Sequence, residues 1–253
     1  MLPINQEECW KMKKIIIDLT RENDKPFYPR DVRNYVGSIV SKEFEDIFMW
    51  HERSTAPFIY SMPQKHSIAI QTYQSDLQDA IEHLCGKLIA NPILKLNGAS
   101  ARIKNVTLKN IDYSSFATGM YEYQTRTPLI IGTTPGHKRD FMELLDAGND
   151  AAYEMSQFIR QSIIETIETQ SRHWFGEGVD LTDNLMIVMK SSFKPFLLHY
   201  KEKRDYPAVM MNFVSNIRLP GYVGYKIGMG YGELRHISHV KTNKIKTSGE
   251  KNV

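Results

Sequence analysis

The order of apolar patterns up to Tyr113 is the feature that most restricts what this chain can fold into. Apolar runs of strand length alternate there with stretches in which apolar residues recur at the three- and four-residue spacing of a helix. The expected elements are a strand at Lys14–Leu19, a helix from Pro29 to about Met49, strands at Pro57–Ser61 and Ser67–Tyr73, a helix through Leu77–Leu88 and a strand at Ala101–Tyr113. This order of strand, helix, strand, strand, helix, strand is that of the ferredoxin-like βαββαβ unit.

The second half of the chain has the pattern of a more distorted copy of the same unit. The small-residue segment Ser114–Gly119 is the best candidate boundary, which divides the chain into residues 1–115 and 116–253. We expect an extended segment at Tyr121–Thr133, a turn-rich loop at Gly132–Lys138, a helix at Ala151–Trp174, strands at Leu185–Met189, Phe196–Tyr200 and Ala208–Val214, and a final strand at Gly232–Val240. The predicted fold class is therefore α+β, with two tandem ferredoxin-like (RRM-like) units.

Composition excludes some classes of protein and leaves others open. No stretch approaches the roughly 20 apolar residues of a membrane span, and Met1–Lys14 lacks the apolar core of a signal peptide, so we expect a cytoplasmic protein. Cys9 and Cys85 are too few for a metal cluster or a disulfide framework, and free buried thiols are expected. A net charge of +3 does not separate a nucleic-acid binder from an ordinary enzyme, and the lysine-rich tail Lys241–Val253 is interpreted as a solvated end.

A glycine-rich segment, Gly221–Arg235, is the clearest candidate for function. Five of the 15 glycines of the chain lie in it. Glycine adopts positive φ and lets backbone N–H groups approach an anion closely, so the segment is expected to cradle phosphate. The candidate contacts are Gly224, Gly228, Gly230 and Gly232 through the backbone, Arg218, Lys226 and Arg235 through charge, and Tyr222, Tyr225 and Tyr231 through stacking on unpaired bases.

Two nucleotide-binding motifs do not fit this segment. A dinucleotide fingerprint requires G-x-G-x-x-G between a strand and a helix, and no helical pattern follows Gly232. A Walker loop requires a lysine directly after its last glycine, whereas Lys226 precedes Gly228. The structural alternative is a glycine-rich turn packed against the core.

The segment and its surroundings resemble those of a known family. A glycine-rich loop that closes a C-terminal ferredoxin-like unit is typical of the RAMP superfamily of CRISPR-associated RNA-binding proteins. Within it, the chain looks most like the repeat-processing endoribonucleases, the sixth-numbered Cas family. The helix centre Val36-Gly37-Ser38-Ile39, the following Trp50-His51-Glu52-Arg53 and the strand Pro57–Ser61 agree with this resemblance, whereas Gly221 and Gly224 are three residues apart where the family often has two.

The resemblance implies partners and acting residues. The partners are CRISPR repeat RNA and other Cas proteins of an effector complex, the protein is a prokaryotic monomer or homodimer, and no cofactor is implied. RNA can be cleaved without metal when its own 2′-OH attacks the adjacent phosphate, which requires a base, an acid and positive charge. His51 is implied as the acid–base residue, Arg53 as the phosphate contact and Tyr35 as a further group, although Tyr35 also belongs to the apolar stripe of its helix. No lysine follows closely on His51, unlike in some members of the family.

The other histidines have weaker claims to a role. His83 and His173 fall on expected helices and His199 on an expected strand, His66 and His137 fall in expected loops that could face RNA, and His236 and His239 are expected to point to opposite faces of a strand. There is no H-E-x-x-H motif, and Glu43, Glu45 and Asp46 are spread as on a solvated helix face, so a metal mechanism is not expected.

The leading hypothesis is thus a metal-independent endoribonuclease that cuts precursor CRISPR RNA within its repeats and leaves a 2′,3′-cyclic phosphate and a 5′-hydroxyl. One alternative is a RAMP subunit that binds guide RNA without cutting it. Another, from a different class, is a metabolic enzyme whose glycine loop binds a phosphorylated small molecule.

Overall fold

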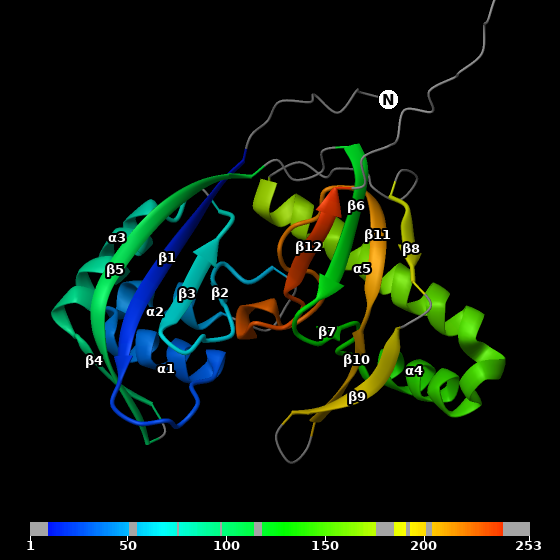
Figure 1. Cartoon of the computed structure of the whole chain (residues 1–253), viewed down its shortest axis with the longest axis horizontal. Coiled ribbons are helices and arrows are strands. Elements are labelled where there is room, and N and C mark those ends of the chain that lie inside the picture. The colour runs from blue at the N-terminus through cyan, green and yellow to red at the C-terminus, as the bar shows by residue number, and fades with distance from the viewer. Residues whose placement is uncertain are drawn as a thin grey trace, which may run out of the picture.

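The computed structural model describes residues 10–50, 55–74, 76–96, 98–113, 118–175, 185–190, 193–200 and 204–239. The chain forms two α+β lobes that lie side by side, the N-terminal half in one and the C-terminal half in the other (Figure 1). The predicted boundary after residue 115 falls at residues 114–117, which lie outside the described residues.

The N-terminal unit is a ferredoxin-like sheet with one added strand. Its elements are β1 (Trp10–Arg21), α1 (Pro29–Ile39), α2 (Lys42–Met49), β2 (Ile59–Tyr60), β3 (Ser67–Thr72), α3 (Gln78–Ala90), β4 (Ile93–Leu96) and β5 (Ala99–Tyr113). The sheet is antiparallel with the order β2-β3-β1-β5-β4. Without the edge strand β4, this is the strand order of a βαββαβ unit, which confirms the prediction for this half.

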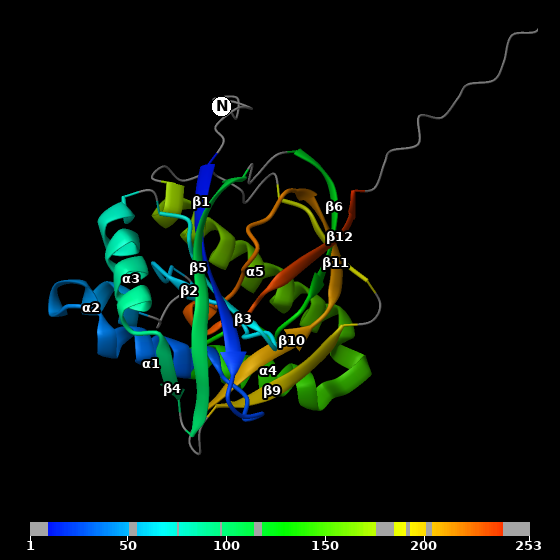
Figure 2. The same ribbon diagram turned by 60° about the vertical axis from the view of Figure 1, so that its left-hand side comes forward.

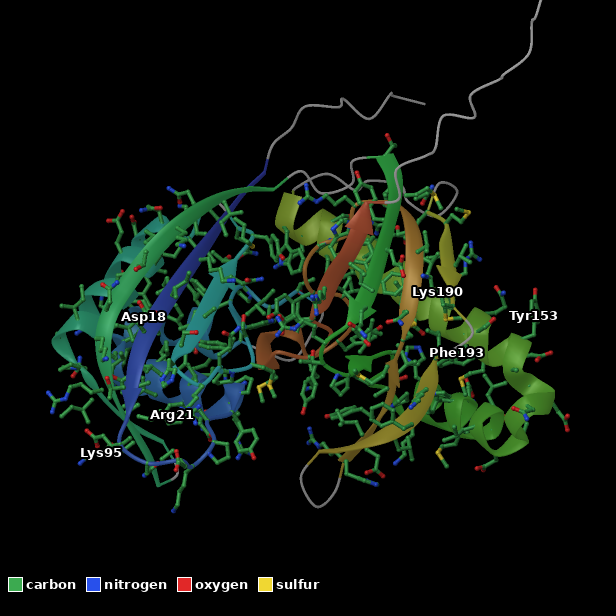
Figure 3. The ribbon with its side chains drawn as sticks, viewed as in Figure 1. Asp18, Arg21, Lys95, Tyr153, Lys190 and Phe193 are labelled. Atoms are coloured by element: carbon green, nitrogen blue, oxygen red, sulfur yellow. The ribbon has the colours of Figure 1, made fainter. Side chains whose placement is uncertain are left out.

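Helices cover one face of this sheet. Ile15, Ile17 and Leu19 alternate along β1 and are buried in the N-terminal core, which they share with residues of α1 and α3. Figure 2 shows the three helices on one side of β1 and β5. Asp18, between two of these core positions, lies on the other face of the sheet (Figure 3). The alternation therefore fixes which face the helices cover.

The expected helix from Pro29 to about Met49 is two helices. Val40 is extended, and the amide of Ser41 donates to Nε2 of His83 on α3 at 3.1 Å. This side-chain acceptor replaces a helical carbonyl, so α1 ends and α2 begins in a new direction. Apolar residues keep their spacing on both sides of the break, and for that reason periodicity alone could not show it.

The C-terminal unit repeats the ferredoxin-like arrangement in a modified form. Its elements are β6 (Thr118–Thr125), β7 (Leu129–Ile130), α4 (Pro135–Ala147), η1 (Gly148–Ala151), α5 (Ala152–Phe175), β8 (Ile187–Met189), β9 (Lys194–Tyr200), β10 (Arg204–Met210), β11 (Asn212–Ile217), η2 (Ile227–Met229) and β12 (Leu234–His239). The main sheet has the order β12-β6-β11-β8, and a smaller sheet has the order β7-β10-β9. The main order again matches a βαββαβ unit, and the fold class of two tandem ferredoxin-like units is confirmed.

The expected turn-rich loop at Gly132–Lys138 is wrong in its second half, because α4 begins at Pro135. Thr134 caps this helix, and its side chain accepts the amide of His137 at 3.2 Å. Proline at the first helical position lacks only an N–H that would have no helical partner there. The Pro135-Gly136 pair therefore starts a helix and does not form a turn, and His137 lies in its first turn.

The second crossover of the C-terminal unit contains no α-helix. In the N-terminal unit, α3 connects the third strand of the fold to the fourth. In the C-terminal unit, residues 218–233 make this connection, with the three-residue turn η2 as their only helical element. This connection contains the glycine-rich segment.

None of the helices in the described part of the chain is long and apolar enough to cross a membrane.

Candidate functional site

The glycine-rich segment lies at the junction between the two units. Most of its residues are buried, including Tyr222, Val223, Ile227 and Met229, and its first apolar residues belong to the core that α5 covers. Figure 1 shows η2 between the two lobes. The segment therefore fills the place of the missing helix and faces the other unit.

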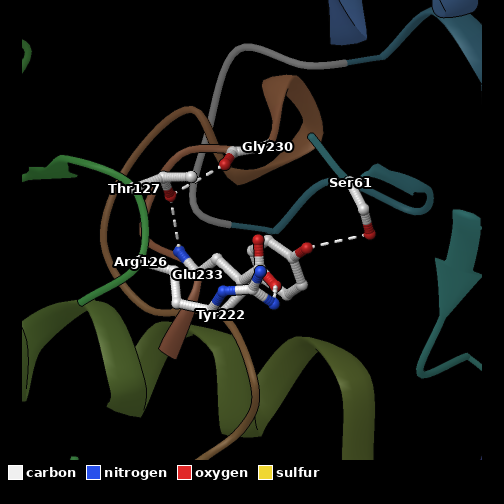
Figure 4. Close-up of polar contacts among 6 residues, drawn as sticks. All are labelled: Ser61, Arg126, Thr127, Tyr222, Gly230 and Glu233. Atoms are coloured by element: carbon white, nitrogen blue, oxygen red, sulfur yellow. Dashed lines mark hydrogen bonds and ion pairs between the residues drawn. The ribbon is translucent and has the colours of Figure 1, made fainter. Parts of the chain in front are cut away.

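Three contacts join the segment to the N-terminal unit. The amide of Gly221 donates to the hydroxyl of Tyr73 at 3.1 Å. The hydroxyl of Tyr222 donates to Oγ of Ser61 at 2.9 Å (Figure 4). Nη1 of the buried Arg33, on α1, lies 3.1 Å from Sδ of Met229. Because Ser61 and Tyr73 flank β2 and β3, the segment docks on the edge of the N-terminal sheet.

Two glycines are required by close backbone packing. Gly230 has φ +79, and a Cβ there would lie 2.6 Å from the carbonyl oxygen of Tyr60 on β2. Gly232 has φ +71, and a Cβ there would lie 1.8 Å from the carbonyl oxygen of Val223. No other residue fits such positions without a shift of the backbone. The glycines thus serve contact between the units and within the segment.

This packing corrects the expectation that the amides of Gly230 and Gly232 cradle phosphate. The amide of Gly230 donates to the carbonyl of Ile227 at 2.8 Å, and that of Gly232 donates to the carbonyl of Pro128 at 2.9 Å. Both residues are buried. Donors that already have protein acceptors cannot form an anion-binding nest, so the alternative of a glycine turn packed against the core describes these two residues.

A polar network fixes the end of the segment (Figure 4). Oγ1 of the buried Thr127 donates to the carbonyl of Gly230 and accepts the amide of Glu233, both at 2.9 Å. The carboxylate of Glu233 pairs with Nη1 of Arg126 at 3.1 Å. One hydroxyl thus satisfies a donor and an acceptor that would otherwise be buried unpaired.

The tyrosines of the segment differ in their availability. Tyr222 is only 3% exposed and uses its hydroxyl in the bond to Ser61, so stacking of a base on Tyr222 was a wrong expectation. Burial also raises its pKa. Tyr225 and Tyr231 are half-buried, and burial raises the pKa of Tyr225. These two remain candidates for contact with a ligand.

The predicted cations stay near the surface around the buried glycines. Arg218 and Arg235 are exposed. Lys226 is half-buried and is the one described non-glycine residue with positive φ, at 59°. Its ammonium lies 5.7 Å from the ring centre of Tyr206 on β10. Of the predicted phosphate contacts, these side chains fit the role better than the glycine backbone, including that of the buried Gly224 and Gly228.

The predicted catalytic residues lie on or directly after the first two helices. His51 and Arg53 lie outside the described residues. Of the described residues on either side of them in sequence, Trp50 is the C-cap of α2, the carbonyl of Phe48 accepts the hydroxyl of Tyr60 at 3.0 Å, and the buried Ala56 belongs to the core of the C-terminal unit.

Tyr35 is a buried residue of the N-terminal core. It is 9% exposed in the N-terminal core, and its hydroxyl donates to the carbonyl of Asn91 at 2.6 Å. Burial raises its pKa. A buried phenol that already donates to a carbonyl is poorly placed to exchange a proton with a substrate, in line with its place in the apolar stripe.

Sequence reasoning missed the surroundings of two exposed histidines. Nδ1 of His199 lies 2.6 Å from Oδ1 of Asp205, and Nζ of Lys138 lies 3.0 Å from the other oxygen of that carboxylate. These hydrogen bonds, that of His199 first, lower the pKa of Asp205. His236 lies beside two tyrosines of β6. Cross-strand register would have been required to find either group.

Among the described residues, no group of three or more histidine, cysteine, aspartate or glutamate side chains is placed to hold a metal ion.

Comparison with known proteins finds the same fold in solved structures. No protein-family model and no curated protein matches the sequence. The chain is similar to a crystal structure of Cas6b, with a TM-score of 0.65 and 15% identity, over 90% of this chain and 100% of that one. It is also similar to the CRISPR RNA processing endoribonuclease Cas6b, with a TM-score of 0.58 and 14% identity over 90% and 100% of the two chains. A third similar structure is an RAMP protein binding different RNA substrates, with a TM-score of 0.56 and 16% identity over 89% and 100%.

At these identities the likeness shows the fold. Two tandem ferredoxin-like units are arranged in this chain as in Cas6 and RAMP proteins, which confirms the Cas6-like RAMP fold expected from the sequence.

Proposed function

We propose that this protein is a metal-independent endoribonuclease that cuts precursor CRISPR RNA within its repeats. The observation that carries the proposal is the likeness of fold over 90% of the chain to the CRISPR RNA processing endoribonuclease Cas6b. The place of His51 in the sequence, two residues after the end of α2, supports it, because histidine transfers protons near neutral pH.

In this proposal His51 takes or gives a proton at the cut phosphodiester, and Arg53 stabilises the charge on the phosphorus centre. The 2′-hydroxyl of the RNA attacks the adjacent phosphorus, and the P–O5′ bond breaks. A proton leaves the 2′-oxygen and another arrives at the 5′-oxygen, so the products are a 2′,3′-cyclic phosphate and a 5′-hydroxyl. Arg218, Lys226 and Arg235 hold the RNA by its phosphates.

The burial of the glycine-rich segment bears on the alternatives. A phosphorylated small molecule bound by the glycine amides requires donors that Gly230 and Gly232 already use within the protein. The metabolic-enzyme alternative is therefore disfavoured. A RAMP subunit that binds RNA without cutting has the same fold and is separated from the proposal by chemistry alone.

The test incubates the purified full chain with end-labelled repeat RNA of its own genome in excess EDTA. We expect cleavage at one position within the repeat, and a single 2′-deoxy nucleotide at that position should abolish it. The 3′ fragment should accept a radioactive phosphate from polynucleotide kinase without prior phosphatase treatment, as a 5′-hydroxyl does. His51→Ala should lower the single-turnover rate by at least about 100-fold without a matching loss of affinity.

A matched control is His173→Ala, which removes an exposed histidine at the end of α5. It should cut at the wild-type rate. Equal cleavage by His51→Ala and wild type removes His51 from the mechanism. Tight binding of the repeat by wild type without cleavage favours the non-catalytic RAMP subunit, and absence of both binding and cleavage overturns the proposal.

A further inference from the structure

An exposed histidine on the edge strand β12 is held against two buried tyrosines. The ring centre of His236 lies 5.7 Å from that of Tyr123, at an interplanar angle of 60°, and 5.8 Å from that of Tyr121, at 54°. Tyr123 is its cross-strand neighbour on β6. The two tyrosines are 3% and 8% exposed, whereas His236 is exposed. The exposed imidazole therefore lies against two rings that are buried in the protein.

The support is rigid because its hydroxyls are used. The hydroxyl of Tyr123 accepts the amide of Leu219 at 2.8 Å. The hydroxyl of Tyr121 lies 3.5 Å from the carbonyl of Thr118. Aromatic rings in edge or tilted contact are held at a preferred geometry, and a ring so held loses little further freedom when a ligand stacks on it.

An exposed arginine is next in sequence to a residue bonded to this support. Arg218 precedes Leu219, whose amide is bonded to Tyr123, and its own side chain is exposed. Burial raises the pKa of Tyr123 to about 12, and the nearby charge of Arg218 acts in the opposite direction. One buried phenol is thus packed against an exposed imidazole and bonded to the backbone next to an exposed arginine.

We propose that His236 is a stacking position for one unpaired base of the bound RNA and that Arg218 contacts a phosphate of the same strand. The inference rests on the proposed function, since it takes RNA as the ligand, and it adds a nucleotide contact on an element far from His51 in sequence. An aromatic ring beside a cation is the combination by which proteins hold single-stranded nucleic acid. Stacking requires a flat ring but no proton, which separates this role from acid–base chemistry.

The test compares His236→Ala with His236→Phe in the full chain, with Arg218→Gln as a third variant and His173→Ala as control. Affinity for the repeat RNA is measured by fluorescence anisotropy in EDTA at several salt concentrations. His236→Ala should bind roughly 5- to 150-fold more weakly, whereas His236→Phe should stay near wild type. Arg218→Gln should lower the slope of log affinity against log salt by about one. His173→Ala should bind as wild type does.

A second readout follows the base itself. The position of the stacked base in the repeat is not assumed, so 2-aminopurine is placed at each unpaired position in turn. At one position the wild type and His236→Phe should quench the fluorescence more than His236→Ala does. Thermal melting confirms that the variants fold, as expected for an exposed side chain.

The outcomes separate this inference from the proposed function. If wild type binds and cuts the repeat but His236→Ala does the same with equal affinity, the stacking role is wrong and the proposed function stands. If His236→Phe binds as weakly as His236→Ala, the imidazole acts through a hydrogen bond or a proton, and stacking is again wrong. If the wild type binds RNA in a His236-dependent way but does not cut it, cleavage fails and stacking stands. Absence of any RNA binding overturns both.

Discussion

The two units differ most in their second crossover. In the N-terminal unit α3 packs on the sheet and closes the core from outside, as a ferredoxin-like fold requires. In the C-terminal unit residues 218–233 take that place, and this segment also contacts the N-terminal unit through Gly221, Tyr222 and Gly230. One unit thus completes its own core, while the other depends on its neighbour.

This difference explains why glycines gather in one connection and not in the other. A helix contacts its surroundings through side chains, so its backbone stays several ångströms away from neighbouring elements. The glycine-rich segment brings its backbone against the carbonyl of Tyr60. A close fit between backbones restricts relative movement of the units at Tyr60, whose hydroxyl donates to the carbonyl of Phe48 in α2. Stability of the junction and geometry of the proposed site are therefore expected to be coupled.

The largest expected effect comes from the aromatic stack between the units. Trp174 near the end of α5 and Tyr73 after β3 stack with ring centres 4.6 Å apart, and both are buried. Trp174→Ala should lower the free energy of unfolding by about 3–5 kcal/mol, because it removes a large buried ring and leaves a cavity. Urea unfolding measures the loss, and hydrogen exchange should show reduced protection in β3 as well as in α5.

The matched control for this stack lies within one unit. Phe48 and Phe58 stack with ring centres 4.4 Å apart in the N-terminal core. Phe48→Ala should cost a similar free energy but should reduce exchange protection in the N-terminal unit alone. Unchanged protection of β3 in Trp174→Ala would mean that the two units are not joined through this stack.

The next effect concerns the close approach at Gly230. Gly230→Ala should lower the free energy of unfolding by about 2–4 kcal/mol, because a positive φ and a clash with the carbonyl of Tyr60 add up. Gly98→Ala separates the two causes, since φ there is also +79 and the added carbon would meet only the flexible end of the Lys25 side chain. That variant should lose only about 1–2 kcal/mol. Equal losses at the two positions, measured by urea unfolding, would mean that the backbones are not in close contact at Gly230.

The sequence supports the architecture well where local rules decide it. The apolar run Lys14–Leu19 predicts β1, and helical spacing predicts α3 and α5, because each pattern reflects burial in the core. Local sequence signals did not predict the ends of helices that depend on residues far away in sequence or on ambiguous local motifs. The break at Val40 depends on His83, and α4 was missed because Pro135-Gly136 suits both a turn and a helix start.

For the candidate site the limit is of the same kind. A glycine-rich sequence shows that the backbone is free to adopt unusual conformations, but not what it faces. The carbonyl of Tyr60, which requires Gly230, comes from the other unit. The ring of Tyr222 is amphipathic, so its burial against Ser61 could not be told from exposure to RNA. His236 contacts Tyr121 and Tyr123 because β12 pairs with β6, and sequence spacing does not give the register of that pairing.

Ionisation of Tyr222 should make the stability of the junction depend on pH. Burial raises the pKa of this tyrosine, whereas in the unfolded chain it ionises near pH ~10. Above that pH the unfolded state loses the proton first. The contribution of the buried Tyr222 to the free energy of unfolding is therefore fully present below pH ~10. It falls as pH rises further, at a rate that approaches about 1.4 kcal/mol per pH unit. Tyr222→Phe should reduce the slope of unfolding free energy between pH 10 and 11 by about 1 kcal/mol per pH unit, because the unfolded phenol is only half ionised at pH ~10. Tyr153→Phe, at an exposed position, should leave the slope unchanged, and an unchanged slope in Tyr222→Phe would contradict burial of the phenol at the junction.

The smallest expected effect belongs to the ion pair that closes the segment. The side chains of Arg126 and Glu233 are 49% and 19% exposed, and their backbones are bonded as well, with the amide of Arg126 donating to the carbonyl of Glu233 at 2.7 Å. Arg126→Gln should therefore cost only about 0.2–1 kcal/mol, and the loss should shrink as salt is raised, because solvent and ions screen a partly exposed pair. Arg139→Gln is the control, since Arg139 pairs with its own neighbour Asp140 at a more exposed position and should show no change. A loss above about 2 kcal/mol in urea unfolding would mean that the charge, and not the glycine backbone with Thr127, holds the segment in place.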